Sequence, residues 1–339
     1  MYHLITYPEA IVVGLLQGVT ELFPISSLGH SVLIPALVGG SWAKDLSVSA
    51  QESPYLAFIV GMHVATALAM IIIFWRDWLR IVRGFFGSLT HAVRPAPGTR
   101  RLQPQNPEQK LAWMIILATI PVGIAGLLLE HDFRTYFSKP IPTAIFLAVN
   151  GLILLSGEAA RRRRISLDQQ QAVEDRQMAA VGGPGVARHS TGQRALRQQE
   201  ASLAIQSNRR LTTQLGWVSS VGLGASQILA LLPGISRDGI VMVTGMFRGL
   251  SRQDAARFSF LLSAPVILAA GMLKIPDLTG PLGNGVRGQV IVGSILSGVG
   301  AYFALRFLVR YFAANRSLVP FAIYCLVFGL GSAIYLGLT

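Results

Sequence analysis

Six long apolar runs constrain this chain more than any other feature of its sequence. They cover residues 55–75, 111–130, 142–158, 258–275, 286–308 and 318–338. Each is close to the length of about 20 residues that an α-helix needs to cross the hydrocarbon core of a bilayer. Of the 339 residues, 52% are hydrophobic and only 13% are charged. The sequence therefore predicts an all-α, polytopic membrane protein with six transmembrane helices.

The positive charge of the chain is concentrated between these runs. A net charge of +13 and a pI near 10.7 would also suit a nucleic-acid-binding protein. However, the arginines and lysines gather in two connecting segments, residues 76–110 and 161–210. Cytoplasmic loops of membrane proteins carry an excess of these residues. We therefore assign both segments to the cytoplasm and expect membrane lipids, and no nucleic acid, as partners.

Two further apolar regions, residues 9–39 and 216–248, are interrupted near their middle by Pro, Gly and Ser. The sidedness of the six runs requires each region to begin and end on the same side of the membrane. Pro24 cannot continue a helix, whereas Ser26 and Ser27 are good N-caps for a new one. We therefore expect two re-entrant helix-loop-helix hairpins, the first entering from outside and the second from the cytoplasm. Such hairpins require protein or water to satisfy their broken backbone.

The two hairpins also resemble each other in sequence. Aligned without a gap, they match at several positions: Gly14 with Gly224, Gln17 with Gln227, Ser26 with Ser236 and Gly29 with Gly239. Three apolar runs follow each hairpin, and the two halves have opposite orientations. This is typical of an inverted-topology repeat, which places its site at the interface between the halves. The first membrane repeat is predicted to cover residues 1–158 and the second residues 214–339.

Between the repeats, residues 159–213 are rich in Arg, Gln, Ala and Gly. This composition cannot build an apolar core, so we expect a mostly disordered cytoplasmic linker. Four successive arginines, Arg161 to Arg164, directly follow an apolar run. Such a cluster most often anchors a helix end to anionic lipid. A regulatory or partner-binding role is the alternative.

Ionisable and hydroxyl side chains in the first hairpin point to a functional site. A charged group at the centre of a membrane helix costs about 3 kcal/mol on insertion scales. Gln17 and Glu21 lie one helical turn apart and share a face. Ser26 and Ser27 begin the returning half-helix, whose free N–H groups favour an anion. His30 follows one turn later, within reach of a serine hydroxyl, and a serine beside a base can attack phosphorus. Alternatively, Glu21 is a structural group that caps the neighbouring backbone.

The second hairpin supplies a fixed positive charge, Arg237. Arginine suits bidentate phosphate binding, and nearby glycines let backbone N–H groups approach the oxygens. The candidate partners in phosphate binding flank it in sequence: Gly234, Ser236 and Gly239. The alternative is that Arg237 forms an ion pair with Asp238 or Glu21 that only locks the repeats together. The two hairpins together predict a buried pocket for a phosphate group carried on a lipid.

Three segments make this prediction more specific. They are residues 17–30 (QGVTELFPISSLGH), residues 233–237 (PGISR) followed by 258–262 (FSFLL), and residues 320–324 (PFAIY). In these motifs the chain resembles the undecaprenyl-pyrophosphate phosphatase family, also known as bacitracin-resistance proteins. The likeness covers nearly the whole chain outside residues 159–213. It implies hydrolysis of undecaprenyl pyrophosphate to undecaprenyl phosphate and inorganic phosphate at the bacterial cytoplasmic membrane, which recycles the lipid carrier for peptidoglycan synthesis.

The resemblance also implies roles for individual residues. Glu21, His30 and Arg237 are expected to be essential and Ser27 to be the nucleophile. Substrate-binding roles are expected for Gln17, Ser26, Ser236, Gly234 and Gly239. A divalent cation, Mg²⁺ or Ca²⁺, is expected to neutralise the pyrophosphate, with Glu21 and Asp238 as its candidate ligands. The site is expected to face the external side.

Two residues depart from the family pattern. Asp238 stands where the family usually has a serine, and Leu28 replaces a small or hydroxyl residue. A carboxylate beside an anionic substrate is repulsive unless Asp238 pairs with Arg237, binds the metal or stays protonated.

Two alternatives to this interpretation are open. In the mechanism, direct attack by water is the alternative to attack by Ser27. In the function, the alternative is a transporter or flippase of prenyl phosphates, because broken helices in an inverted repeat are also a transporter architecture. A homodimer is among the assemblies that the sequence leaves open.

Overall fold

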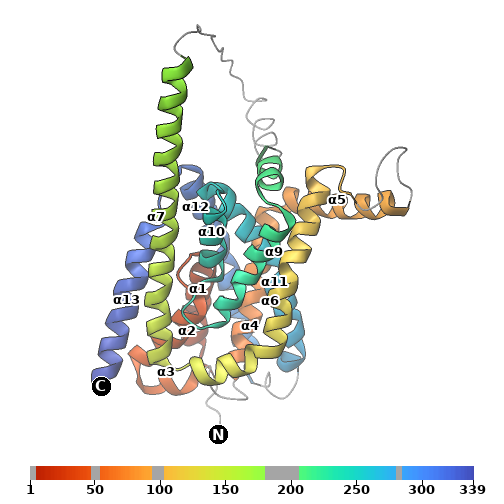
Figure 1. Ribbon diagram of the computed structural model, residues 1–339. Coiled ribbons are helices and arrows are strands. Elements are labelled where there is room, and N and C mark those ends of the chain that lie inside the picture. The colour runs from red at the N-terminus through yellow and green to blue at the C-terminus, as the bar shows by residue number, and fades with distance from the viewer. Residues whose placement is uncertain (1–4, 47–53, 94–102, 180–205, 280–284) are drawn as a thin grey trace, which may run out of the picture.

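A computed structural model describes residues 5–46, 54–93, 103–179, 206–279 and 285–339. Over these residues the regular structure is helical, and no strand is present. Most helices run along a common direction and form one bundle, in which the start of α1 and the end of α13 lie at the same end (Figure 1). The predicted all-α class is therefore confirmed for the described residues.

The two predicted hairpins are both interrupted helices. The first consists of α1 (Tyr7–Leu22) and α2 (Ser27–Val38), followed by the short α3 (Gly40–Asp45). The second consists of α9 (Trp217–Ser226), the 3-10 helix η1 (Gln227–Leu231) and α10 (Arg237–Phe247). These boundaries place a break at Pro24 and a second break before Arg237, as the sequence predicts.

The same cap begins the returning helix in each hairpin. The Ser26 Oγ accepts a hydrogen bond from the Gly29 N–H at 3.2 Å. The Ser236 Oγ accepts one from the Gly239 N–H at 3.1 Å. Because a serine side chain satisfies one of the free N–H groups at a helix start, it stabilises the break in both hairpins. The matched serines and the matched glycines of the hairpin alignment are thus the acceptor and the donor of the same capping hydrogen bond in each hairpin.

The long helices correspond to the six apolar runs. They are α4 (Pro54–Ile73), α6 (Pro107–Phe137), α7 (Pro140–Ala179), α11 (Arg252–Thr279), α12 (Arg287–Ala313) and α13 (Val319–Leu338). Among the described residues, five segments are long and apolar enough to cross a membrane: Pro107–Leu129, Pro140–Ser166, Arg252–Leu273, Arg287–Ala313 and Val319–Leu338. Within α4, the apolar part Gly61–Ile73 is shorter than the length needed to cross a membrane. Five of the six predicted runs are therefore candidate spans by length and composition.

The two halves of the chain pack across each other. α4 lies against α11 and α7 against α13, while α1 packs on α12 and α9 on α6. Glycines allow the last two contacts to be close. A Cβ atom at Gly14 would lie 2.6 Å from the carbonyl oxygen of Gly293, and one at Gly224 would overlap that of Ala118. The first helix of each hairpin therefore rests on the middle long helix of the other half.

Three connections between the apolar runs contain more helix than the sequence predicts. Residues 76–110 were expected to be a connecting loop, but most of the described part is α5 (Trp75–Val93), which runs crosswise to the long helices (Figure 1). The connection between the apolar runs 111–130 and 142–158 is also largely helical, since α6 continues to Phe137. The expected disordered linker, 159–213, is helical through Ala179 and again over residues 206–214, where Leu211 is buried. Arg, Gln, Glu, Ala and Leu are good helix formers, so low apolar content does not by itself prevent a helix. Residues 180–205 of that prediction lie outside the described residues.

Buried ion pairs join helices near the end of the bundle that carries α5. The Glu158 carboxylate on α7 accepts hydrogen bonds from the Arg252 side chain at 2.5 and 2.7 Å and from the Leu318 N–H at 2.9 Å. The Arg257 side chain donates to Asp77 at 2.9 Å. These arginines of α11 thus have structural partners, in addition to any part in membrane orientation.

The contact between α9 and α6 predicts a specific loss of stability. Gly224→Ala should lower the thermal unfolding midpoint of the purified protein, because the new methyl group forces α9 away from α6 at a cost of about 1–3 kcal/mol. Gly222→Ala, on the same helix, is the matched control, since nothing lies within 4 Å of a Cβ atom there. Equal midpoints for the two variants would show that the two helices do not pack this closely.

Candidate active site

The two hairpin breaks meet inside the bundle, where side chains hydrogen-bonded to backbone groups join them. The Ser26 Oγ accepts a hydrogen bond from the Gly234 N–H at 3.2 Å. The buried Asn150 side chain of α7 donates to the Pro24 carbonyl oxygen at 2.9 Å and accepts from the Ser236 N–H at 3.0 Å. Protein groups thus satisfy part of the broken backbone, as a re-entrant structure requires.

Gly234 could not be replaced without disturbing this junction. Its φ is +109°, a conformation that favours glycine. A Cβ atom at this position would also lie 2.5 Å from the Thr143 carbonyl oxygen. The predicted role of Gly234 in binding phosphate has no direct support here, but its backbone N–H group lies at the contact between the hairpins.

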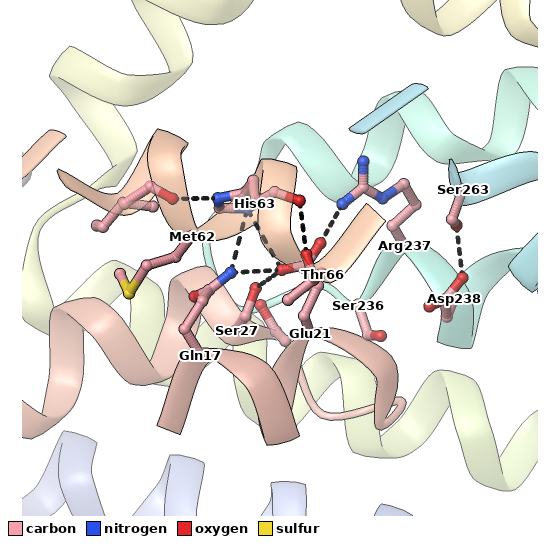
Figure 2. Close-up of polar contacts among 12 residues, drawn as sticks. Gln17, Glu21, Ser27, Met62, His63, Thr66, Ser236, Arg237, Asp238 and Ser263 are labelled. Atoms are coloured by element: carbon pink, nitrogen blue, oxygen red, sulfur yellow. Dashed lines mark hydrogen bonds and ion pairs between the residues drawn. The ribbon is translucent and has the colours of Figure 1, made fainter. Parts of the chain in front are cut away.

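The Glu21 carboxylate is the centre of a buried polar cluster (Figure 2). Its Oε2 atom accepts hydrogen bonds from the Gln17 side chain at 2.9 Å and from the Ser27 hydroxyl. Its Oε1 atom accepts from the Arg237 guanidinium at 2.5 Å. The His63 Nε2 atom of α4 lies 3.3 Å from Oε2. Groups from both hairpins and from α4 therefore converge on one carboxylate.

Arg237 combines a buried partner with partial exposure. Its side chain is 22% exposed, whereas that of Glu21 is only 2% exposed. A buried carboxylate is costly unless it is paired and hydrogen-bonded, and Arg237 supplies the compensating charge. The exposed part of the guanidinium retains donors that can meet an incoming anion. The Arg237–Glu21 pair that was considered as a lock between the repeats is present, and it lies within the candidate site.

Ser26, Ser27 and Ser236 differ in their surroundings. The Ser27 hydroxyl donates to the Glu21 carboxylate, as a nucleophile beside a base would do. The hydroxyl oxygens of Ser26 and Ser236 accept hydrogen bonds from backbone N–H groups at the helix starts. Ser26 and Ser236 thus support the two loops, and Gly239 provides the N–H group that Ser236 caps.

His30 does not lie beside a serine hydroxyl, contrary to prediction. Its Nδ1 atom is 2.7 Å from the Ser26 carbonyl oxygen, and its Nε2 atom is 2.8 Å from the Tyr324 hydroxyl. The ring stacks on those of Tyr324 and Phe328, with centroid distances of 5.7 and 5.3 Å. Both nitrogens therefore have other partners, and His30 joins α2 to α13.

The imidazole next to Glu21 is that of His63, which the sequence interpretation missed. Its Nδ1 atom is 2.8 Å from the Ile59 carbonyl oxygen of the same helix, so Nδ1 carries a proton. Its Nε2 atom also lies 3.3 Å from the Gln17 amide nitrogen. His63 thus faces the cluster with an atom that can accept or release a proton. A histidine inside the apolar run 55–75, like Asn150 inside 142–158, was the available signal.

Asp238 is hydrogen-bonded to two side chains that the sequence interpretation did not name. Its Oδ1 atom accepts hydrogen bonds from the hydroxyls of Ser259 and Ser263 on α11, each at 2.6 Å. Figure 2 shows Asp238 and Glu21 on opposite sides of Arg237. The carboxylate that replaces the usual serine is therefore directed toward α11 and away from the Glu21 cluster.

The two candidate metal ligands, Glu21 and Asp238, both have protein partners in this structure. No group of three or more His, Cys, Asp or Glu side chains among them could hold a metal ion. Glu21 and Asp238, the two candidate ligands, are each hydrogen-bonded to other side chains on opposite sides of Arg237. The two carboxylates thus have different partners in this structure, and the divalent cation stays a prediction.

Comparison with known proteins agrees with these motifs. The family model described as "Bacitracin resistance protein BacA" matches residues 10–331. The chain is 55% identical to the undecaprenyl-diphosphatase of Mycolicibacterium paratuberculosis, over 98% of both chains. It is 50% identical to undecaprenyl-diphosphatase 2 of Frankia alni, over 96% of this chain and 97% of the relative. It is 35% identical to undecaprenyl-diphosphatase 2 of Chromobacterium violaceum, over 95% of both. With a match of this extent, the chain belongs to the bacitracin resistance protein BacA family.

Proposed function

We propose that this protein is an integral-membrane phosphatase that hydrolyses undecaprenyl pyrophosphate to undecaprenyl phosphate and inorganic phosphate. The names of the relatives favour this reaction over transport of a prenyl phosphate. The observation that carries the proposal is the buried cluster in which Glu21 accepts hydrogen bonds from both Ser27 and Arg237. By family resemblance, the product returns to peptidoglycan synthesis, and the activity confers resistance to bacitracin.

The membrane arrangement is part of the proposal. α4, α6, α7, α11, α12 and α13 are six spans of the bacterial cytoplasmic membrane, and the two hairpins are re-entrant. The matched serine caps and the packing of each hairpin on the other half support an inverted repeat. The arginine-rich end of the bundle faces the cytoplasm by the positive-inside bias. The first hairpin then enters from outside, and the site opens to the external side.

The pyrophosphate is proposed to bind where α2 and α10 begin. Both helix starts present N–H groups to an anion, and Arg237 is the first residue of α10. The partly exposed guanidinium can hydrogen-bond the phosphate oxygens, and it stabilises the charge that develops on them. The prenyl chain stays among the apolar helices. Ser26 and Ser236 contribute by holding the two loops in place.

The Ser27 oxygen is proposed to attack the terminal phosphorus. Its proton passes to Glu21, to which the hydroxyl already donates. The bond from phosphorus to the bridging oxygen breaks, and undecaprenyl phosphate leaves with the electron pair. Glu21 gives the serine proton to the departing undecaprenyl phosphate. Water then attacks the phosphoserine and passes a proton through Glu21 to the Ser27 oxygen, which releases inorganic phosphate and restores Ser27. In this scheme Glu21, and not His30, is the base.

His63 and Gln17 are proposed to support Glu21. The amide of Gln17 donates to the Glu21 carboxylate at 2.9 Å and holds its orientation. The Nε2 atom of His63 is near enough to share the proton that Glu21 receives. A divalent cation, Mg²⁺ or Ca²⁺, stays a prediction of the family resemblance, and no step described here passes through it. A homodimer likewise stays a prediction.

Hydrolysis and transport are separated by measuring phosphate release from undecaprenyl pyrophosphate with purified protein in detergent. Glu21→Gln should lower kcat by about 100-fold or more, because an amide cannot take the serine proton. Arg237→Ala should have an effect at least as large. Arg248→Ala, an exposed arginine at the end of the same helix, is the matched control and should keep wild-type activity. A wild-type protein that binds the substrate but releases no phosphate would refute the phosphatase proposal.

A covalent intermediate should be detectable on Ser27. Acid quenching during turnover of substrate labelled at the terminal phosphate should leave label on the wild-type protein and none on Ser27→Ala. The exposed Ser156→Ala serves as the control and should retain both label and activity. If Ser27→Ala hydrolyses the substrate at the wild-type rate, direct attack by water is the correct route.

Substitution of His63 and substitution of His30 should affect different properties, kcat in the first case and the unfolding midpoint in the second. His63→Ala should lower kcat by about tenfold or more and leave the unfolding midpoint nearly unchanged, because this ring acts on Glu21. His30→Ala should lower the unfolding midpoint, since it removes the contact of α2 with Tyr324 and Phe328. Tyr324→Phe should show a smaller decrease of the same kind. Wild-type kcat in His63→Ala would exclude a catalytic role for this residue.

A further inference from the structure

Among the described residues, α5 contacts the rest of the protein through the face that carries Asp77, Ile81 and Gly84. Asp77 and Ile81 are buried on this face, and Asp77 accepts a hydrogen bond from Arg257 at 2.9 Å. A Cβ atom at Gly84 would lie 2.8 Å from the backbone of Glu108, so α5 and α6 are in close contact. The indole N–H of Trp113 donates to the Ser88 hydroxyl at 2.9 Å. These contacts fix the rotation of α5 about its own axis and therefore determine which face points away from the protein.

The opposite face of α5 carries a stripe of large apolar side chains. They follow one another at alternating spacings of four and three residues, the period of one helix face. Their exposed fractions range from 39 to 77%: Trp75, Leu79, Val82, Phe86, Leu89 and Val93. A continuous apolar face of this kind is uncommon on a surface that contacts water alone. Its regular spacing indicates that something apolar covers the whole length of the helix.

The stripe continues the outer surface of α4. Leu68 and Ile72, at the end of α4, are 49 and 61% exposed, and Trp75 follows after one further turn of the chain. α5 then runs crosswise to the long helices and extends beyond the side of the bundle (Figure 1). The apolar face thus begins where the proposed lipid-facing surface of α4 ends.

Positive charge flanks the stripe. Arg76 and Arg83 are exposed, and the Arg76 guanidinium lies 5.3 Å from the centroid of the Trp75 ring. The single acidic residue of α5, Asp77, is buried and pairs with Arg257 and Arg80. The exposed surface of α5 is therefore apolar with a basic edge, which matches the boundary between acyl chains and anionic headgroups.

We propose that α5 is an interfacial helix whose apolar stripe is inserted into the cytoplasmic leaflet, with Arg76 and Arg83 bound to anionic phospholipid headgroups. The occupant is lipid rather than a second copy of the chain, because the basic edge would repel itself in a symmetric contact. An inserted helix of this type reaches about 5–10 Å into the headgroup and acyl boundary. The proposal concerns the anchoring of the protein and does not require the phosphatase mechanism.

Fluorescent labelling of the full chain in nanodiscs, one protein per disc, tests the insertion. Cys325 is fully buried, so a cysteine introduced at the surface takes the label. We compare Phe86→Cys with Leu127→Cys, a lipid-facing control on α6 that is 75% exposed, and with the exposed Gln103→Cys before α6. The label at 86 should be quenched by lipids with a nitroxide near the headgroup and shielded from aqueous iodide. The label at 127 should also be shielded from iodide, and the label at 103 should be accessible.

A second experiment tests whether Arg76 and Arg83 bind anionic headgroups. Quenching of the label at 86 should be stronger with nitroxide-bearing phosphatidylglycerol than with the phosphatidylcholine equivalent. The difference should disappear when Arg76→Gln and Arg83→Gln are added, while a pair of exposed arginines on α12, Arg306→Gln and Arg310→Gln, should leave it unchanged. Accessibility of the label at 86 to iodide would overturn the proposal. Shielding without lipid quenching would also overturn it and would assign the face to a protein partner. Equal quenching by the two lipids would remove the anionic-headgroup part.

Discussion

The rest of the site depends on the hydrogen-bonded ion pair between Glu21 and Arg237. Each residue lies in a different hairpin, and each would be an uncompensated charge in an apolar bundle without the other. Removing one partner of such a pair typically costs about 3–5 kcal/mol, because a buried charge is left behind. The pair therefore holds the hairpins together and places a base and a guanidinium side by side. Stability and the proposed chemistry come from the same contact, so a substitution at either residue changes both.

Residues with periodic or capping roles could be predicted from the sequence. The apolar runs, the breaks at Pro24 and before Arg237, and the serine caps each follow from local rules of helix formation. The shared face of Gln17 and Glu21 could also be predicted, since the two lie one helical turn apart. The contact of Ser27 with Glu21 was not predicted, because it crosses the break between α1 and α2. A polar residue that stands alone in an apolar run could not be assigned a role from the sequence. His63 and Asn150 have no local pattern around them, and their roles arise only when α4 and α7 meet the hairpins.

The two departures from expectation at His30 and Asp238 have a common cause. Both predictions assigned a side chain to the pocket because of its neighbours in sequence. A helix turns each successive side chain by about 100°, so residues close in sequence can face different helices. His30 faces α13, and Asp238 faces the two serines of α11. Ser259 and Ser263 supply the hydrogen bonds that a buried carboxylate needs, which explains how this chain accommodates an aspartate next to Arg237.

The crossed packing of the halves has a consequence for biosynthesis. α1 is among the first helices to leave the ribosome, yet the helix on which it rests, α12, is close to the end of the chain. Until α12 is inserted, Gly14 and Gly18 of α1 have no partner for their exposed backbone, and the Glu21 carboxylate has no Arg237. The first hairpin therefore cannot complete its packing during its own synthesis. The contacts of the first hairpin are complete only when the second half has formed, so a chain that is truncated in its second half also lacks an assembled first half.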